Sequence, residues 1–423
     1  MKKKMLAIFV SAFLLGSLVC QNKLNTKADT STTTASKPGI NWMNNTNYFP
    51  LGANYAWQDW DYDFSDNGWD SRFTTIKSTF DQMSSQGVHA VRWWVYCNMW
   101  ASPLFSSTDG KGLCTGLPTN WVTHMKQAAD YANSKNMKIY FTFTSFDVAK
   151  TNNSWYHGSI IDDPTVRKSF IDNAVVPVVQ ALGTNPGVMG WDVVNEPEWM
   201  IASADGGSPG ESIVGFPLST VRSFVKDMVD TIHKYAKQPV SVGSASMKWI
   251  GAQYNFWSGL GLDFYDFHWY DWATPWFNPL TTPVSSLKLD KPVIIGEMMP
   301  DTMNSSLKMS HQQVLEGLVK NGYSGYLLWA WTDSNTNCVG KTTPDFDNFK
   351  KAHPELNIDK PGSNSLKGDL NGDGKVDASD VSLLKQYILN PSQNYDTTVL
   401  DMNNDGKVNV QDYILLEKSI ANS

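Results

Sequence analysis

The 423-residue sequence is poor in charged side chains and in cysteine, and each scarcity excludes a class of function. Charged residues make up 18% of the chain, and the formal net charge is -7. Nucleic-acid binding requires a basic surface to face the phosphates, so this charge argues against it. The sequence contains no CxxC pair and no Cys/His cluster, and it therefore gives no sign of zinc ligands. A glycine-rich phosphate loop is also lacking, which disfavours a doubly wound, nucleotide-binding sheet.

One long apolar run is present, and it lies at the N-terminus. Three lysines at positions 2 to 4 precede an uncharged apolar stretch from Met5 to Val19. Fifteen residues are too few for an ordinary membrane span, and the layout is typical of a secretory signal. We predict a signal peptide over residues 1–28 and a Thr/Ser-rich leader over residues 29–38. Cleavage after Ala28 and lipidation at Cys20 are both left open by the sequence, and after signal removal no membrane segment is expected.

The chain has only four cysteines, of which Cys97, Cys114 and Cys338 follow the predicted signal. Export allows disulfides, but an odd count leaves at least one thiol unpaired. A Cys97–Cys114 bond would close a short loop, and three free thiols are an equal alternative.

Tryptophan, by contrast, is abundant. The 18 Trp residues are about three times what average usage would give, and all lie between Trp42 and Trp331. A core rarely needs so many indoles, because each is large and keeps a polar edge. We therefore expect a groove for flat ligands, and an acidic chain makes sugar rings the favoured ligand.

Near the C-terminus a twelve-residue pattern rich in Asp, Asn and Gly occurs twice, 32 residues apart. In each copy, positions 1, 3, 5, 9 and 12 place side-chain oxygens around one point, position 7 offers a carbonyl, and Gly at position 6 permits a sharp turn. Hard oxygen ligands of this kind favour Ca²⁺. The predicted ligands are Asp369, Asn371, Asp373, Lys375, Asp377 and Asp380 in the first loop, and Asp401, Asn403, Asp405, Lys407, Asn409 and Asp412 in the second.

An apolar helical pattern follows each loop, and the duplicated loop–helix unit resembles a type I dockerin over residues 366–423. The resemblance implies a small all-α domain with two structural Ca²⁺ ions. It also implies docking onto a cohesin module of a scaffoldin, and hence a secreted, extracellular, cellulosome-associated protein. Positions 10 and 11, which help to choose the cohesin in that family, are Ala378 and Ser379 in one loop but Val410 and Gln411 in the other.

Residues 39–353 are predicted to form one (β/α)8 barrel, joined to the dockerin by a linker over residues 354–365. Eight strand-like runs alternate with helical stretches; a doubly wound open sheet is the structural alternative. The predicted strands are 51–54, 88–94, 138–144, 188–194, 240–243, 264–268, 293–297 and 325–331. The best supported helices are 71–86, 120–134, 164–182, 218–235 and 309–321, whereas the fifth and sixth helices are weak.

Chemistry in such a barrel lies at the C-terminal ends of the strands. Two glutamates, Glu196 and Glu297, end the fourth and seventh predicted strands and should face each other across the mouth. Glycoside hydrolysis requires two carboxyl groups in that relation. Structural salt bridges at the rim are the alternative.

The segment Trp191-Asp-Val-Val-Asn195-Glu196-Pro197, followed about a hundred residues later by Val293-Ile-Ile-Gly-Glu297, resembles glycoside hydrolase clan A, and family 5 most of all. Arg92, the His268-x-Tyr270 pair and a Trp on the eighth strand occur in the matching order. The resemblance implies a retaining endo-β-1,4-glycanase acting on cellulose or β-mannan, with Glu196 as acid/base and Glu297 as nucleophile and with no cofactor in the chemistry. The implied substrate-binding residues are Arg92, Asn195, His268, Tyr270, Trp329 and Trp57.

The resemblance has gaps. The His that this family often carries after the third strand is absent, since that region reads Thr142-Phe-Thr-Ser-Phe146-Asp147. Extra Trp residues also crowd the loops, and we expect about half of them to face a cleft. Three alternatives therefore remain: a glycanase for xylan or mixed-linkage glucan, a non-catalytic glycan-binding module carried by a dockerin, and a calcium-binding C-terminal cap without a partner.

Overall fold

The computed structural model describes residues 38–43, 46–107, 109–151, 156–202, 212–298, 309–332, 343–359, 367–370, 376–390, 397–403 and 405–421. Eight parallel strands form a closed barrel in the order β3-β4-β7-β8-β9-β10-β11-β12, so the predicted (β/α)8 fold is confirmed. Their bounds are Leu51–Asn54, Ala90–Trp94, Lys138–Ser145, Val188–Asn195, Val240–Ser244, Tyr265–Trp269, Val293–Met298 and Tyr326–Leu328. The predicted signal, residues 29–37 of the leader, residues 360–365 of the linker and Cys338 lie outside the described ranges.

Each barrel strand falls where the hydrophobic runs predicted it, with one difference at the eighth. The run 325–331 was expected to be extended throughout, but β12 ends at Leu328. Beyond it, the Trp329 amide donates to the Met298 carbonyl and the Trp331 amide donates to the Asn54 carbonyl. The residues after β12 thus still bond to both neighbouring strands, β11 and β3, although they are no longer in a regular strand.

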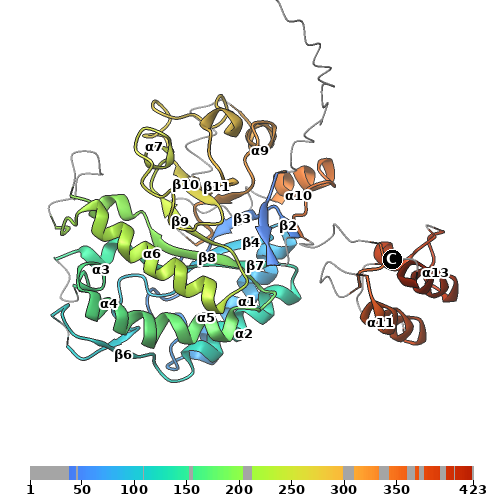
Figure 1. Cartoon of the computed structure of the whole chain (residues 1–423), viewed down its shortest axis with the longest axis horizontal. Coiled ribbons are helices and arrows are strands. Elements are labelled where there is room, and N and C mark those ends of the chain that lie inside the picture. The colour runs from blue at the N-terminus through green and yellow to red at the C-terminus, as the bar shows by residue number, and fades with distance from the viewer. Residues whose placement is uncertain are drawn as a thin grey trace, which may run out of the picture. The chain divides into compact units, whose positions relative to one another are not determined.

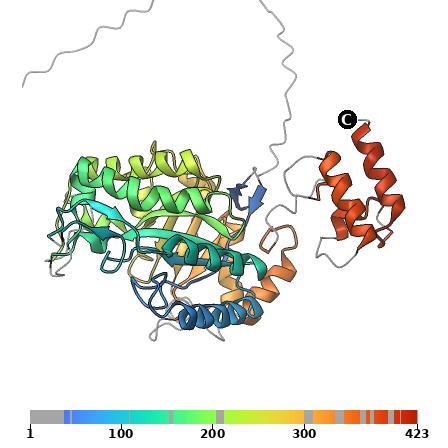
Figure 2. The same ribbon diagram turned by 90° about the horizontal axis from the view of Figure 1, so that it is seen from below.

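Helices lie outside the strands, with α1 next to α2 and α5 next to α6 (Figures 1 and 2). The long ones are α1 Trp69–Ser85, α2 Trp121–Ser134, α6 Leu218–Tyr235, α9 His311–Lys320 and α10 Thr343–Ala352. The predicted helix 164–182 is α4 Pro164–Phe170 and α5 Val176–Leu182, joined by a π-helical turn, Ile171–Val175. Pro177 follows that turn and has no N–H for the preceding helical carbonyl, which explains the local widening.

The fifth and sixth helices, which the sequence pattern supported weakly, are correspondingly short. The short helix α7 (Met247–Ile250) follows β9, and the 3₁₀ turn η5 (Val284–Leu287) follows β10 after a run of turns. The other short elements are α3 Ser159–Asp162, η2 Phe146–Ala149, η4 Pro197–Met200, β5 Leu104–Phe105 and β6 Cys114–Gly116.

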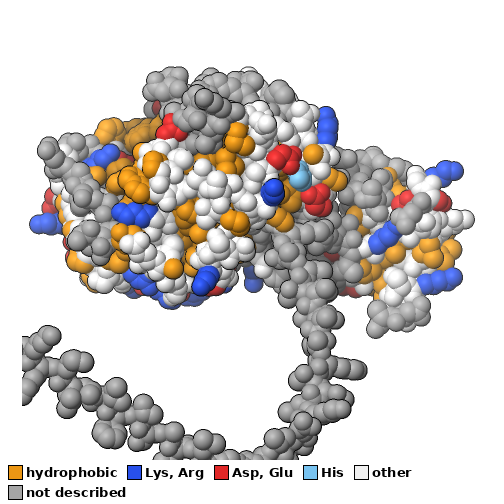
Figure 3. All heavy atoms as spheres, turned by 90° about the horizontal axis from the view of Figure 1, so that it is seen from above, with side chains coloured by type: hydrophobic (Ala, Val, Ile, Leu, Met, Phe, Trp, Pro, Cys, Tyr) orange, Lys and Arg blue, Asp and Glu red, His pale blue; other side chains and the backbone are white. Residues whose placement is uncertain are grey.

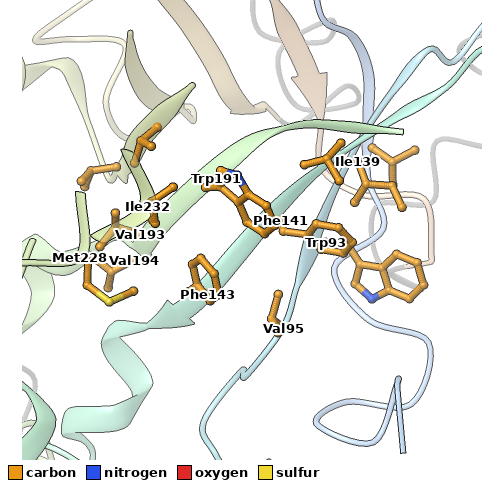
Figure 4. Close-up of a cluster of buried hydrophobic side chains, with 14 of the residues drawn as sticks. Trp93, Val95, Ile139, Phe141, Phe143, Trp191, Val193, Val194, Met228 and Ile232 are labelled. Carbon is orange, nitrogen blue, oxygen red and sulfur yellow. The ribbon is translucent and has the colours of Figure 1, made fainter. Parts of the chain in front are cut away.

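Aromatic side chains pack the layer between the strands and the helices. The Trp191 ring stacks on Phe141 at 5.8 Å and on Phe143 at 5.4 Å between ring centroids (Figure 4). Trp191 is fully buried, as are Trp93 and Trp121. Part of the Trp excess therefore serves the core, because stacked rings bury large apolar areas.

The amino-terminal end of the barrel is closed by a hairpin that the sequence did not predict. Its strands, β1 (Ile40–Trp42) and β2 (Thr46–Tyr48), pair antiparallel. The Trp42 indole donates to the Val188 carbonyl, and the Tyr48 hydroxyl donates to the His89 carbonyl, both where barrel strands begin. The opposite end of the barrel is left for the polar residues described below.

The C-terminal residues form a separate small core. Helices α11 (Ala378–Leu389) and α13 (Val410–Ala421) contact each other, and α12 is Thr397–Leu400. Leu384, Leu400 and Leu416 are buried at their centre. This confirms a small all-α unit at the C-terminus.

Three further features of the described residues are the state of the two cysteines, the length and polarity of the helices, and the charge on the barrel face. Cys97 and Cys114 are separate buried thiols, so the disulfide alternative is not realised. Within the described ranges, every helix is too short or too polar to traverse a bilayer. Acidic, basic and hydrophobic side chains are interspersed on the barrel face in Figure 3, so that face carries both signs of charge.

Candidate active site

The predicted catalytic and binding residues meet at the mouth of the barrel. A hollow of about 380 Å³ opens there, with both glutamates in its wall. Of the other predicted residues, Asn195, Tyr270, Trp57 and Trp329 line it. Arg92 and His268 were expected to bind substrate, but both side chains are fully buried and contact carboxylates behind the hollow instead.

Glu297, at the C-terminal end of β11, is held by two strong donors. The Arg92 guanidinium lies 2.5 Å from Glu297 Oε1, and the Tyr270 hydroxyl donates to Oε2 over 2.5 Å. Burial and the nearby Glu196 raise the pKa of Glu297, and Arg92 and Tyr270 oppose that rise without reversing it. Both carboxylate oxygens thus have positive or hydrogen-bonding partners, which stabilise the anion.

Arg92 is the centre of a buried network inside the barrel. Besides Glu297 it contacts Asp192, 2.6 Å from Nη2, and Asn195, whose Oδ1 lies 2.8 Å from Nη2. Burial alone would lower the pKa of Arg92, but Asp192 and Glu297 raise it, so the guanidinium stays charged. Its planar guanidinium group therefore fixes side chains of two strands on different sides of the barrel order, β8 and β11.

The space for this network depends on glycine. A Cβ at Gly243 would lie 2.6 Å from Arg92 Nη2 and 2.9 Å from Asp192 Oδ2. A Cβ at Gly296 would lie 2.1 Å from an oxygen of Asp266, a fully buried carboxyl. No larger residue fits either strand position without displacing the charged groups.

Glu196, which follows β8, occupies a different environment. Its backbone is left-handed, with φ 49° and ψ 49°, a conformation that costs a non-glycine residue about 1–2 kcal/mol. The Trp199 indole donates to Oε2 over 2.8 Å, and no cation lies within ion-pair distance in the described residues apart from the His268 ring. Burial raises the pKa of Glu196 to about 7. The carboxyl is therefore half protonated near neutral pH.

His268 lies between the two glutamates. Its Nδ1 is 2.7 Å from Glu196 Oε1 and 3.4 Å from Glu297 Oε2. Burial lowers its pKa to about 4, so the ring is neutral near pH 7 and carries no positive charge that would lower the pKa of either carboxyl group. This neutrality leaves Glu196 free to keep a raised pKa.

These three side chains also form a grouping of His and Glu whose spacing could hold a metal ion, with ligand atoms within 4.8 Å of one another. Both glutamates already have protein partners outside the grouping, Trp199 for Glu196 and Arg92 with Tyr270 for Glu297, and His268 bonds to Glu196 itself. Hydrogen bonds between these protein groups therefore account for the short distances among Glu196, His268 and Glu297. Glycoside hydrolysis itself requires only two carboxyl groups.

Indoles line the hollow on two sides. Trp57, Trp60, Trp94 and Trp329 form one cluster, in which neighbouring rings meet edge to face at 4.5 to 6.3 Å. Trp199 and Trp272 line the other side. Nine Trp residues were expected in loops after the first, second and sixth barrel strands, and four of them line the hollow: Trp57, Trp60, Trp94 and Trp272. Trp69, Trp93 and Trp269 are buried in the core instead.

Sequence reasoning missed several members of the site. Asp192 is a charged residue in an otherwise apolar strand, and that position should have marked it as a partner for a buried cation. Trp199 follows the Asn-Glu-Pro segment, but nothing in its local pattern shows that its indole reaches Glu196. In place of the absent His after the third barrel strand, Ser145 and Asp147 line the hollow.

The two calcium-type loops show the same internal bonding where they are described. In the first, the Asp380 carboxylate accepts from the amides of Leu370 and Asp377. In the second, the Asp412 carboxylate accepts from the amides of Asn403 and Asn409, of which Asn409 is the equivalent of Asp377 and Asn403 lies one residue beyond the equivalent of Leu370. The last acid of each loop thus joins its two ends, which supports the predicted repeat.

The second loop supplies an oxygen-rich turn. Backbone amides of Asp405 and Gly406 donate to Asp401, and Gly406 has a φ of +80°. The carboxylates of Asp401, Asp405 and Asp412 and the amides of Asn403 and Asn409 are hard oxygen ligands, so this donor set fits Ca²⁺. Asn371, Asp373 and Lys375 of the first loop lie outside the described residues.

Comparisons with known proteins agree with both parts of the chain. Residues 367–421 match the type I dockerin domain family. The chain is 28% identical over 357 residues to a mannan endo-1,4-beta-mannosidase from Mytilus edulis, which covers 77% of this chain and 92% of that protein. It is 25% identical over 323 residues to a protein of the same name from Cryptopygus antarcticus, covering 69% and 82% respectively.

The solved structure of β-mannanase from the blue mussel Mytilus edulis superposes with a TM-score of 0.65 and 25% identity, over 77% of this chain and 98% of that one. These similarities confirm the predicted glycanase barrel and the predicted type I dockerin domain.

The buried network makes a stability prediction. Arg92→Met should lower the free energy of unfolding by about 3–5 kcal/mol, because Asp192 and Glu297 would lose their cation while remaining buried. Urea unfolding at pH 7, followed by Trp fluorescence, reports the barrel alone, since all Trp residues lie between Trp42 and Trp331. The matched control is Lys168→Met, which breaks the ion pair with Asp172, where both side chains are exposed, and should cost at most about 1 kcal/mol. Equal losses in the two variants would contradict the assigned role of Arg92.

Proposed function

We propose that this chain, a glycoside hydrolase barrel joined to a type I dockerin domain, is a secreted endo-β-1,4-mannanase that works by retaining double displacement. The observation that carries the proposal is the pair Glu196 and Glu297 in one aromatic-lined hollow, with carboxylate oxygens within 4.8 Å of each other. Retaining glycosidases place their two carboxyl groups about 5–5.5 Å apart, whereas inverting enzymes need about 6.5–9.5 Å to admit a water.

The contrasting environments of the two carboxyl groups suit different roles. Glu297, with Arg92 and Tyr270 on its oxygens, is the anion that attacks the anomeric carbon. Glu196, with a pKa of about 7, carries the proton that the leaving oxygen receives. When Glu297 becomes a neutral ester, its negative charge no longer supports the proton on Glu196. The pKa of Glu196 then falls, and this residue activates the water that releases the sugar.

The remaining polar residues orient the sugar. Asn195 is held by Arg92 through its Oδ1, which leaves its amide N–H groups to meet a sugar hydroxyl at the catalytic position. Trp329, against Trp57 and Trp94, offers a flat surface beneath the same ring. A planar indole and fixed donors hold the anomeric carbon near Glu297, which supplies part of the rate acceleration.

Mannan is favoured over cellulose as the substrate because the curated relatives are mannan endo-1,4-beta-mannosidases. The hollow is open and continues along Trp-lined walls, which supports cutting within a chain. A purely glycan-binding module is disfavoured, because a buried, protonatable Glu196 next to a fixed Glu297 has no role in simple binding.

A substrate screen tests the proposal. The protein should hydrolyse linear mannan and glucomannan to mixed oligosaccharides, and it should be much less active on carboxymethylcellulose and xylan. Glu196→Gln and Glu297→Gln should each lower kcat by at least about 100-fold, since each removes a group that acts in the transition state. The matched control is Glu316→Gln in α9, remote from the hollow, which should be unaffected.

Release of monosaccharide alone would contradict the endo mode, and full activity of either Gln variant would contradict the assigned roles. Retention of the wild type on insoluble mannan without any hydrolysis would support the binding module instead.

The dockerin domain extends the proposal to location and partner. We propose that residues 1–28 direct export and that Asp369–Asp380 and Asp401–Asp412 each hold one structural Ca²⁺. The folded domain would bind a cohesin module and so carry the barrel to a cellulosome. The match over residues 367–421 supports this reading of the repeat.

Calcium removal should abolish the partner interaction without affecting catalysis. In calorimetric titration of the full chain against a panel of cohesins, binding should disappear with EDTA and return with added Ca²⁺. Hydrolysis of mannan should be unchanged under both conditions, because the active-site groups are carboxyl groups. Cohesin binding that survives EDTA, or that never occurs with any cohesin, would contradict this part of the proposal.

A further inference from the structure

Glu198 is a fully buried carboxyl group that the reaction described above does not use. It belongs to the turn η4 and lies two residues after Glu196. Its side chain does not line the catalytic hollow, whereas those of Glu196 and Trp199, on either side of it in this part of the chain, both do. Glu198 therefore faces the protein interior and does not touch the substrate.

Three donors from outside the turn bind the Glu198 carboxyl. The Ser244 hydroxyl and the Trp257 indole donate to Oε1 over 2.5 and 2.7 Å. The Ala245 amide donates to Oε2 over 3.0 Å. Ser244 is the last residue of β9, and Ala245 follows it directly. The carboxyl thus ties the turn η4 to the C-terminal end of the next barrel strand.

The turn also has to hold Glu196 in an unfavourable backbone conformation. The left-handed conformation of Glu196, with φ 49° and ψ 49°, persists only where the surrounding structure enforces it. One restraint is local, since the Glu196 amide donates to the Gly243 carbonyl over 2.6 Å. A single hydrogen bond would still allow the turn to rotate about it, so a second attachment is required.

Glu198 supplies that second attachment. Gly243 binds Glu196, and the next two residues of the chain, Ser244 and Ala245, bind Glu198. Residues 196–198 are therefore bonded at two points along residues 243–245. Two attachments to one rigid strand end fix both the position and the orientation of the turn.

The same anchor fixes Trp199, which follows Glu198 in the chain. The Trp199 indole donates to Glu196 Oε2 over 2.8 Å, and its ring meets Trp249 edge to face at 5.8 Å between centroids. Burial raises the pKa of Glu196, and the bond from Trp199 opposes that rise. A displacement of the turn at Glu198 would carry Trp199 with it and would move the Glu196 carboxyl away from the leaving oxygen.

We propose that Glu198 is a positioning residue for the acid step, because its bonds to the end of β9 hold Glu196 and Trp199 in the geometry in which Glu196 protonates the leaving oxygen. In that step the O–H bond of Glu196 breaks, and the leaving oxygen takes the proton together with the electron pair of the broken C–O bond. Glu198 forms and breaks no covalent bond. The inference rests on the proposed function, in which Glu196 is the acid/base.

The test uses the full-length protein with two substrates that differ in their need for an acid. Mannohexaose releases a sugar oxygen that has to be protonated, whereas 2,4-dinitrophenyl β-mannobioside releases a phenolate that is stable without a proton. Glu198→Gln places an NH₂ group against one of the three donors. It should lower kcat/KM for mannohexaose about 10- to 100-fold, the range for a misplaced catalytic group. For the dinitrophenyl glycoside the fall should be less than about threefold.

A milder variant keeps the test valid if Glu198→Gln does not fold. Ser244→Ala removes one donor from Glu198 and should lower kcat/KM for mannohexaose about 3- to 10-fold, the range for one hydrogen bond. The matched control is Ser241→Ala, on the same strand and equally buried, whose hydroxyl donates to the Phe264 carbonyl instead. The control should leave the kinetics on both substrates unchanged.

A double variant tests whether the effect passes through the acid. When Glu196 is already replaced in Glu196→Gln, Ser244→Ala should cause no further loss on mannohexaose, because both changes act on the same step. A further loss of the same size as in the wild type would overturn the inference.

Equal falls on the two substrates in Glu198→Gln and Ser244→Ala would also overturn it, since a general defect does not depend on the leaving group. Unchanged kinetics in both variants, or equal effects of Ser244→Ala and Ser241→Ala, would overturn it as well. A wild type that cuts neither substrate would overturn the proposed function and this inference together. A wild type that is active while its variants lack the leaving-group dependence would overturn this inference alone.

Discussion

The arrangement at the barrel mouth depends on one buried cation. Arg92 contacts Asp192 and Asn195 on β8 and Glu297 on β11, and its side chain has no solvent exposure. A buried guanidinium is tolerable only when carboxylates and fixed acceptors surround it. The same contacts that neutralise Arg92 therefore also set the positions of the residues that we propose to be catalytic, and the glycines at 243 and 296 leave room for them.

From this constraint follows the difference between the two glutamates. The cation is close to Glu297 and favours its anion, whereas Glu196 has a neutral histidine and an indole as its nearest partners. Burial acts on both carboxyl groups, but only Glu297 has a directly bonded cation to oppose it. The pKa of both carboxyl groups is raised by burial, and the fixed charge of Arg92 and the hydroxyl of Tyr270 oppose that rise at Glu297.

The strands and the two facing glutamates could be predicted because hydrophobic runs and strand-end positions are local patterns. The contact of Trp199 with Glu196 could not, since it depends on how one side chain reaches another residue in space, whereas Asp192 stands out as the one acid in an apolar strand. The hairpin Ile40–Tyr48 was missed for a similar reason, because its short strands matter only against the barrel end that they close. His268 and Arg92 were expected to bind substrate, and the structure shows both side chains fully buried and in contact with the two glutamates or their neighbours.

The central claim is that Arg92 and Tyr270 hold Glu297 as the nucleophile of a retaining reaction. The most direct measurement is to treat the protein with a 2-fluoro-mannosyl donor, which slows release of the covalently bound sugar, and to locate the sugar by peptide mass spectrometry. The account predicts a single adduct on the peptide that contains Glu297. An adduct on Glu196, or hydrolysis with inversion and no adduct, would contradict it.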